Sequence, residues 1–225
     1  MSHITTTHKH EAAAVQLQNL MSLHSWQNAH DLIIQNPQVL TIGSPLHNAF
    51  MSAPSIGDLP PLQLIQRIIA ISPQSICQTS TDQGTVLHRL LRCQIIPGRP
   101  STGESKEIIA RILIEANPNC LRIADSNGWL PLHVLCAHAR NPQFLIQPDF
   151  LRFMMKPFRE SISTENKGGV TPFSMFLSNS IYGLDGNCQI STQMVEAQYY
   201  NSTSTCNYAV VNKFVNESRQ WQCVI

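Results

Sequence analysis

The chain has 225 residues, of which 43% are hydrophobic, enough apolar material for one large domain or for a repeat array with tails. Its 15 basic and 14 acidic side chains leave a formal net charge of +1, which excludes a general electrostatic attraction for nucleic acid or anionic lipid. The 7 cysteines are widely spaced without a C-x-x-C pair, so the pattern predicts reduced structural thiols rather than a disulfide framework or zinc ribbon.

The first ten residues are polar and lack the apolar core of a signal peptide. No later stretch runs long enough without polar residues to cross a membrane. We therefore expect an intracellular, cytoplasmic protein without a membrane anchor.

Residues 1–40 are expected to form an N-terminal helical cap or half repeat. Apolar residues with helical spacing predict a first helix, and they are Ala12, Val15, Leu17, Leu20 and Met21. A second helix is expected over 26–35. Such a cap suits the end of a repeat array, because an end unit has only one neighbour to cover its apolar face.

Four related tetrapeptides then follow along the chain. They are Ser-Pro-Leu-His at 44–47, Thr-Val-Leu-His at 85–88, Leu-Pro-Leu-His at 130–133 and Thr-Pro-Phe-Ser at 171–174. Their starts are separated by 41, 45 and 41 residues, which indicates an internal repeat. Each is expected to open a short helix, since proline fits the first helical turn and Ser or Thr can accept backbone N–H bonds there.

An apolar helical run that ends at a proline accompanies each tetrapeptide. The runs are 29–34 before Pro37, 62–71 before Pro73, 108–116 before Pro118 and 150–155 before Pro157. Proline ends a helix because it lacks the amide hydrogen and restricts the residue before it. In the third run, the spacing predicts one buried face made of Ile108, Ile109, Ile112 and Leu113.

Turn residues lie between each proline and the next tetrapeptide, at 82–84, 125–128 and 166–169. Glycine in these turns supplies the positive φ that other residues resist. Each turn leads directly into a helix, such as the one expected over 132–137.

The tetrapeptides at 44–47 and 130–133 resemble the opening of the ankyrin repeat, whose pattern is T-P-L-H-x-A. The copy at 85–88 lacks the proline, and the copy at 171–174 lacks the histidine. The resemblance covers about residues 26 to 178 and implies units made of a hairpin finger and two antiparallel helices, stacked into a solenoid. It also implies that the repeated histidine makes backbone and inter-repeat hydrogen bonds.

The units are longer than the roughly 33 residues of an ankyrin repeat. Because the connectors are steady, the extra length is expected in loops between the two helices of a unit, near 51–60, 93–103 and 140–148. Residues 181–225 are rich in Asn, Ser, Thr and Gln, and they predict an irregular cap and a poorly ordered, flexible tail.

The predicted fold is therefore all-α, a solenoid of about four diverged ankyrin-like repeats over 41–180 with caps on both sides. The positions that carry the repeat pattern, and are expected to be structural, are Pro45, Leu46, His47, Leu87, His88, Gly128, Pro131, Leu132, His133 and Pro172.

His133, Cys136 and His138 form an H-x-x-C-x-H motif, yet a zinc site usually needs four ligands in paired spacing and no second pair exists. Cys120 or Cys136 with a nearby histidine could in principle act as a thiol nucleophile, but both lie in predicted packed segments. The chain also lacks the common nucleophile, phosphate and dinucleotide motifs. We expect no catalytic site, metal or cofactor.

The sequence predicts a monomeric scaffold or adaptor that binds another protein, through residues that the resemblance exposes: Trp129, Asn127, Arg89 and Arg92. The alternative is a structural repeat fragment of a larger protein whose activity lies elsewhere. The basic residues between 89 and 122 are either a solvated surface or a patch for an acidic partner. They are Arg89, Arg92, Arg99, Lys106, Arg111 and Arg122.

Overall fold

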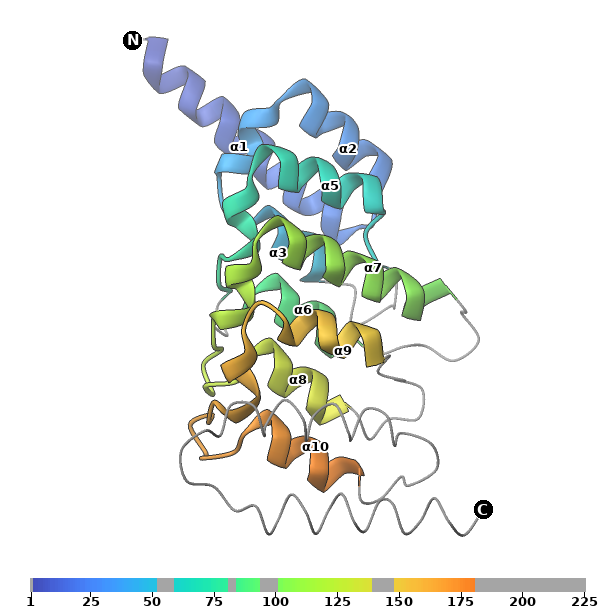
Figure 1. Ribbon diagram of the computed structural model, residues 1–225. Coiled ribbons are helices and arrows are strands. Elements are labelled where there is room, and N and C mark those ends of the chain that lie inside the picture. Colours follow the sequence, from blue (N-terminus) through green and yellow to red (C-terminus); the bar gives the residue numbers. More distant parts are fainter. Residues whose placement is uncertain (1, 52–58, 81–83, 94–100, 139–147, 181–225) are drawn as a thin grey trace, which may run out of the picture. The chain divides into compact units, whose positions relative to one another are not determined.

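The computed structural model describes residues 2–51, 59–80, 84–93, 101–138 and 148–180 (Figure 1). These residues form nine α-helices and no β-strand, which confirms the all-α class for the part of the chain described. Their contacts divide them into two compact units, one ending at Ser126 and the other beginning at Asn127. None of the described helices is long and apolar enough to span a membrane.

Six of the helices belong to the first unit. They are α1 (Ser2–Ser22), α2 (Trp26–Gln35), α3 (Pro45–Met51), α5 (Leu62–Ile71), α6 (Val86–Arg92) and α7 (Ser101–Ala116). The second unit contains α8 (Pro131–Ala137), α9 (Pro148–Met155) and α10 (Pro172–Ser180).

Helices in the first unit pack in two rows (Figure 1). In one row α3 contacts α1 and α6, and in the other α5 contacts α7. The core between them is made of fully buried aliphatic and aromatic side chains, including Ile33, Leu46, Phe50, Ile65, Ile68, Leu87 and Leu113. Each row therefore depends on its neighbours for the burial of its apolar face.

Prolines end the helices of the second row as the sequence predicts. After α2, α5 and α7 the chain forms 3₁₀ turns that begin at a proline: η1 (Pro37–Thr41), η2 (Pro73–Ile76) and η3 (Pro118–Arg122). The residue before each proline leaves the helical region, with φ of −138°, −133° and −153° in turn. The run expected over 62–71 is helix α5.

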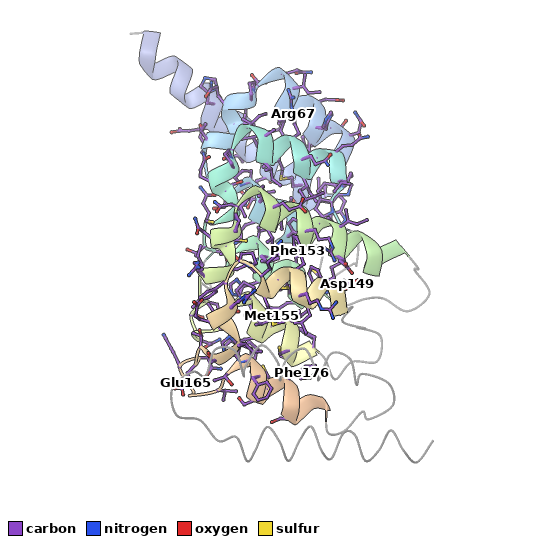
Figure 2. All side chains as sticks on the ribbon, in the orientation of Figure 1. Arg67, Asp149, Phe153, Met155, Glu165 and Phe176 are labelled. Atoms are coloured by element: carbon purple, nitrogen blue, oxygen red, sulfur yellow. The ribbon has the colours of Figure 1, made fainter. Side chains whose placement is uncertain are left out.

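The second unit follows the same order with one difference. Helix α9 ends at Met155, and its 3₁₀ turn η5 (Arg159–Ser163) begins beyond Pro157 rather than at it. Helix α10 packs against α8 and against η5. Phe176 of α10 is buried, whereas Glu165, on the turn before that helix, is exposed (Figure 2).

The predicted buried face of α7 was wrong by one position. Ile109 and Leu113 are buried as expected, but Ile108 is 47% exposed and Ile112 is half-buried, while Ala110 and Ile114 complete the buried face. The run of apolar residues allows two adjacent faces, and packing on the neighbouring helices decides between them. Helix α7 also begins at Ser101, so the end of the loop expected over 93–103 is helical.

The N-terminal helix is present as α1 and runs to Ser22. Leu17 and Met21 are buried, whereas Val15 is 58% exposed and Ala12 is also exposed. Most residues of the three expected inserted loops, and all of the predicted tail at 181–225, lie outside the residues that the structure describes.

Candidate functional site

Short fingers precede α6 and α10 and share one backbone pattern. In the first, the Ser80 N–H donates to the Gly84 carbonyl at 3.0 Å, and in the second the Asn166 N–H donates to the Val170 carbonyl at 3.0 Å. The Asn166 side-chain oxygen also accepts from the Gly168 and Val170 amides, at 2.8 and 3.0 Å. Each finger thus closes on itself immediately before the helix begins.

In each unit, a histidine on an earlier helix bonds to the carbonyl that closes the finger. His47 lies on α3 and His133 lies on α8. His47 Nε2 lies 2.9 Å from the Gly84 oxygen, and His133 Nε2 lies 3.0 Å from the Val170 oxygen. In both cases the two residues are 37 positions apart in the sequence. A carbonyl only accepts, so each Nε2 carries the proton and donates it. The same long-range link therefore occurs once within each unit.

The other ring nitrogen caps the start of the histidine's own helix. His133 Nδ1 accepts the Leu130 N–H at 3.0 Å, and His88 Nδ1 accepts the Thr85 N–H at 3.1 Å. A nitrogen that accepts an amide hydrogen is unprotonated, so these rings are neutral and carry hydrogen on Nε2. The three histidines, His47, His88 and His133, are all buried.

Ser174 replaces the histidine in the fourth tetrapeptide. Its hydroxyl accepts the Thr171 N–H at 3.0 Å, and its own amide donates to the Thr171 hydroxyl at 3.1 Å. This confirms the capping role predicted for Thr171. Serine thus keeps the local bond at the helix start.

The turn before α8, which includes Asn127 and Gly128, forms a further finger, and it contacts the finger before α10 through its backbone. The Lys167 N–H donates to the Asn127 carbonyl at 3.1 Å. Gly128 has a φ of +77°, as expected, and a Cβ placed there would lie 2.7 Å from the Lys167 nitrogen. Close approach of the two fingers therefore requires glycine at this position in addition to its positive φ.

The other positions of the repeat pattern also lie in the core. Pro45 and Pro131 are the first residues of α3 and α8, and Pro172 is the first of α10. These prolines and the leucines that follow in the pattern are buried, and those leucines are Leu46, Leu87 and Leu132. They are committed to packing and are not available to a partner.

The four residues predicted to bind a partner differ in exposure. Asn127 is exposed, while Trp129 is half-buried with its ring centroid 6.3 Å from that of His133. Arg89 is half-buried, and its Nε atom is buried without a hydrogen-bond acceptor among the described residues. Arg92 forms an ion pair with Asp125, whose side chain is only 2% exposed. Arg92 thus has a structural role that the sequence analysis did not anticipate.

The basic residues between 89 and 122 do not share one environment. Lys106 is buried and donates to the Leu91 carbonyl at 3.2 Å and to the Cys93 carbonyl, at the end of α6. Burial lowers the pKa of the Lys106 ammonium to about 8. Arg111 bonds to Glu107 on the same helix, and Arg122 is exposed. Arg99 lies outside the described residues.

The described cysteines are free thiols that burial keeps protonated. Desolvation raises the pKa of Cys120 to about 12, and it raises the pKa of Cys136, Cys93 and Cys77 as well. Thiolates are the reactive form, so this environment opposes a nucleophilic role for Cys120 or Cys136. No cluster of three or more His, Cys, Asp or Glu side chains able to hold a metal occurs within the described ranges.

Two buried charged residues were missed by sequence reasoning, Lys106 and Asp125. Nothing in the local sequence distinguishes them from solvated surface residues, because their partners come from a different helix or turn. Comparison with known proteins adds no assignment, since no protein-family model and no curated protein matches this chain.

Proposed function

We propose that the chain is a non-catalytic protein-interaction module built from about four diverged ankyrin-like repeats. The supporting observation is the recurring link from a buried histidine to the finger carbonyl 37 residues ahead, at His47 with Gly84 and at His133 with Val170. The resemblance implies that finger, first helix, second helix and proline turn recur in this order along the chain. A link that recurs at the same spacing of 37 residues supports such a repeat. A cytoplasmic scaffold or adaptor is the role that this construction suits best.

The repeat-pattern residues are buried and the finger residues are exposed, which supports a binding role for the fingers. Leucines, prolines and histidines of the repeat pattern are buried, so the fingers and the outer parts of α6 remain for contact. Asn127 and Lys167 are exposed at the fingers. Tryptophan and arginine are the commonest interface anchors, and Trp129 and Arg89 offer both side chains half-exposed.

Arg89 is the best single anchor of the four predicted residues. Its Nε atom is buried and out of a partner's reach, so a partner carboxylate would bind the terminal nitrogens of the half-buried guanidinium. Arg92 is a poor choice for a binding test, because its substitution would leave Asp125 as an unpaired buried charge and lower the stability of the fold.

The test is capture of a partner by the full chain from an extract of its source cell, followed by affinity measurement with the purified partner. We expect Trp129→Ala combined with Arg89→Ala to weaken binding by at least about tenfold, or ~1.4 kcal/mol. The matched control is Trp26→Ala combined with Arg152→Ala, which changes a half-buried tryptophan of α2 and an exposed arginine of α9.

The control variant is expected to bind like the parent. Equal weakening by both double variants would contradict a site at the fingers and α6, and so would normal binding by the Trp129 and Arg89 variant. Failure of the parent chain to retain any protein would overturn the proposed function itself.

A further inference from the structure

The turn at 125–128 contains Asn127 followed by Gly128, the only Asn–Gly pair in the sequence. Asn127 is exposed, and Gly128 has no side chain to shield its amide nitrogen. Asparagine before glycine is the pair in which the backbone nitrogen most easily reaches the side-chain carbonyl, and asparagine is among the thermolabile residues.

We propose that Asn127 is a site of spontaneous deamidation that alters the contact between the two fingers of the second unit. The Gly128 amide nitrogen attacks Asn127 Cγ, a C–N bond forms, and the side-chain nitrogen leaves as ammonia with the amide proton. Water then opens the resulting cyclic imide at either carbonyl. The product is aspartate or isoaspartate at position 127, and no oxidant or reductant takes part.

The two products affect the finger differently. Aspartate keeps the backbone intact and adds a negative charge beside Lys167, which is exposed. Isoaspartate routes the chain through Cβ and Cγ of residue 127, which lengthens the backbone and turns the former main-chain carbonyl into a free carboxylate. That carbonyl accepts the Lys167 N–H at 3.1 Å, so we expect the rerouted backbone to lose this bond.

The neighbouring finger provides a contrast within the same unit. Asn166 is followed by Lys167, whose side chain hinders attack, and its side-chain oxygen is held by the Gly168 and Val170 amides. The fold therefore directs the reaction to Asn127 and protects Asn166. The inference stands apart from the proposed function, because it concerns the chemistry of the finger and not what the finger binds.

Digestion with trypsin separates the two sites cleanly. Cleavage after Arg122 and Arg140 releases peptide 123–140, and cleavage after Arg159 and Lys167 releases peptide 160–167. Each peptide contains one asparagine, so a mass gain from amide to acid identifies the residue that reacted. The full chain is incubated at mildly alkaline pH, digested and analysed by mass spectrometry over time.

We expect conversion in peptide 123–140 to be at least about tenfold faster than in peptide 160–167. The variant Asn127→Gln keeps an amide but would close a larger ring, so its peptide is expected to stay unchanged. A synthetic peptide of residues 123–133 reports the rate without the fold. If it converts while the folded chain does not, the turn blocks the reaction and the proposal is overturned.

The effect on the finger contact needs a separate readout. The isoaspartyl form, isolated by chromatography, is expected to exchange the Lys167 amide hydrogen at least about tenfold faster than the parent. Asn127→Asp represents the other product and is expected to exchange like the parent. Equal exchange in the isoaspartyl form and in Asn127→Asp would contradict the proposed loss of the contact.

Discussion

Helices α8 and α10 of the second unit begin with related tetrapeptides that end in different residues, His133 and Ser174. The histidine caps its own helix and reaches the Val170 carbonyl of the next finger, whereas the serine completes only the local cap. The two nitrogens of the His133 ring thus make one local hydrogen bond and one long-range hydrogen bond. The comparison separates the part of the pattern that starts a helix from the part that links that helix to the following finger.

Substitution at the third, hydrophobic position of the tetrapeptide is expected to give the largest difference in stability loss between the two helices. Leu132 is buried, whereas Phe173 at the equivalent position is half-buried. We expect Leu132→Ala to lower the free energy of unfolding by about 2–5 kcal/mol, measured by urea denaturation. Phe173→Ala is expected to cost less, and an equal or larger loss would show that α10 is packed like α8.

The glycines of the two fingers provide the second contrast. Gly128 and Gly169 have φ of +77° and +71°, but an added Cβ meets the Lys167 backbone only at Gly128 and finds open space at Gly169. Gly128→Ala is expected to cost about 2–4 kcal/mol, from the positive φ and the collision together. Gly169→Ala should cost about 1–2 kcal/mol from φ alone. Equal losses of stability would contradict the close approach of the fingers.

Replacing His133 or Ser174 by alanine tests directly how much the histidine link to the finger adds to the local helix cap. His133→Ala leaves the Leu130 amide and the Val170 carbonyl without the ring, which we expect to cost about 2–3 kcal/mol. Ser174→Ala removes bonds that are exposed and is expected to cost less than about 1 kcal/mol. Thermal and urea unfolding of both variants would measure the difference, and equal losses would mean that the link to the finger contributes nothing.

A further difference concerns pH, because Cys136 of α8 corresponds to Leu177 of α10, which does not titrate. Burial raises the pKa of Cys136, so the folded state binds the thiol proton more tightly than the unfolded state does. The stability from this group is therefore complete below the ordinary thiol pKa near 9 and is lost as pH rises further.

Each pH unit in that range is expected to cost about 1.4 kcal/mol from one such thiol. Cys136→Ala should flatten the alkaline decline of stability by that amount, as measured by urea denaturation at pH values above the ordinary thiol pKa. Cys77 is only partly buried, so Cys77→Ala serves as the control and is expected to change the alkaline decline of stability less than Cys136→Ala does. An unchanged slope in Cys136→Ala would show that the thiol reaches water.

Local patterns predicted much of this arrangement. Helix α5 ends at Ile71, two residues before Pro73, and α8 begins at Pro131, as expected, because proline acts on its own backbone and on that of its neighbours. Positive φ at Gly128 was also predictable from the turn composition.

Features that depend on distant segments were not predictable in the same way. The buried face of α7 was misplaced, since Ile108 fits the apolar spacing but is 47% exposed. The roles of Lys106 and Asp125 require partners 13 to 33 residues away in sequence. Contact between the Gly128 turn and Lys167 likewise arises from the stacking of fingers and not from either turn alone.

The most direct test of the account is the protonation state of the repeat histidines, read from long-range proton–nitrogen correlation spectra of the full chain. We predict that His133 is neutral at pH 7 with hydrogen on Nε2, because its Nδ1 accepts the Leu130 amide hydrogen and its Nε2 faces the Val170 carbonyl. His88 is expected to be neutral for the same reason at Nδ1, and His47 is expected to carry hydrogen on the Nε2 that faces the Gly84 carbonyl. A His133 ring with hydrogen on Nδ1 alone, or an Nε2 without hydrogen at His47 or His133, would contradict the link between each of these helices and the following finger.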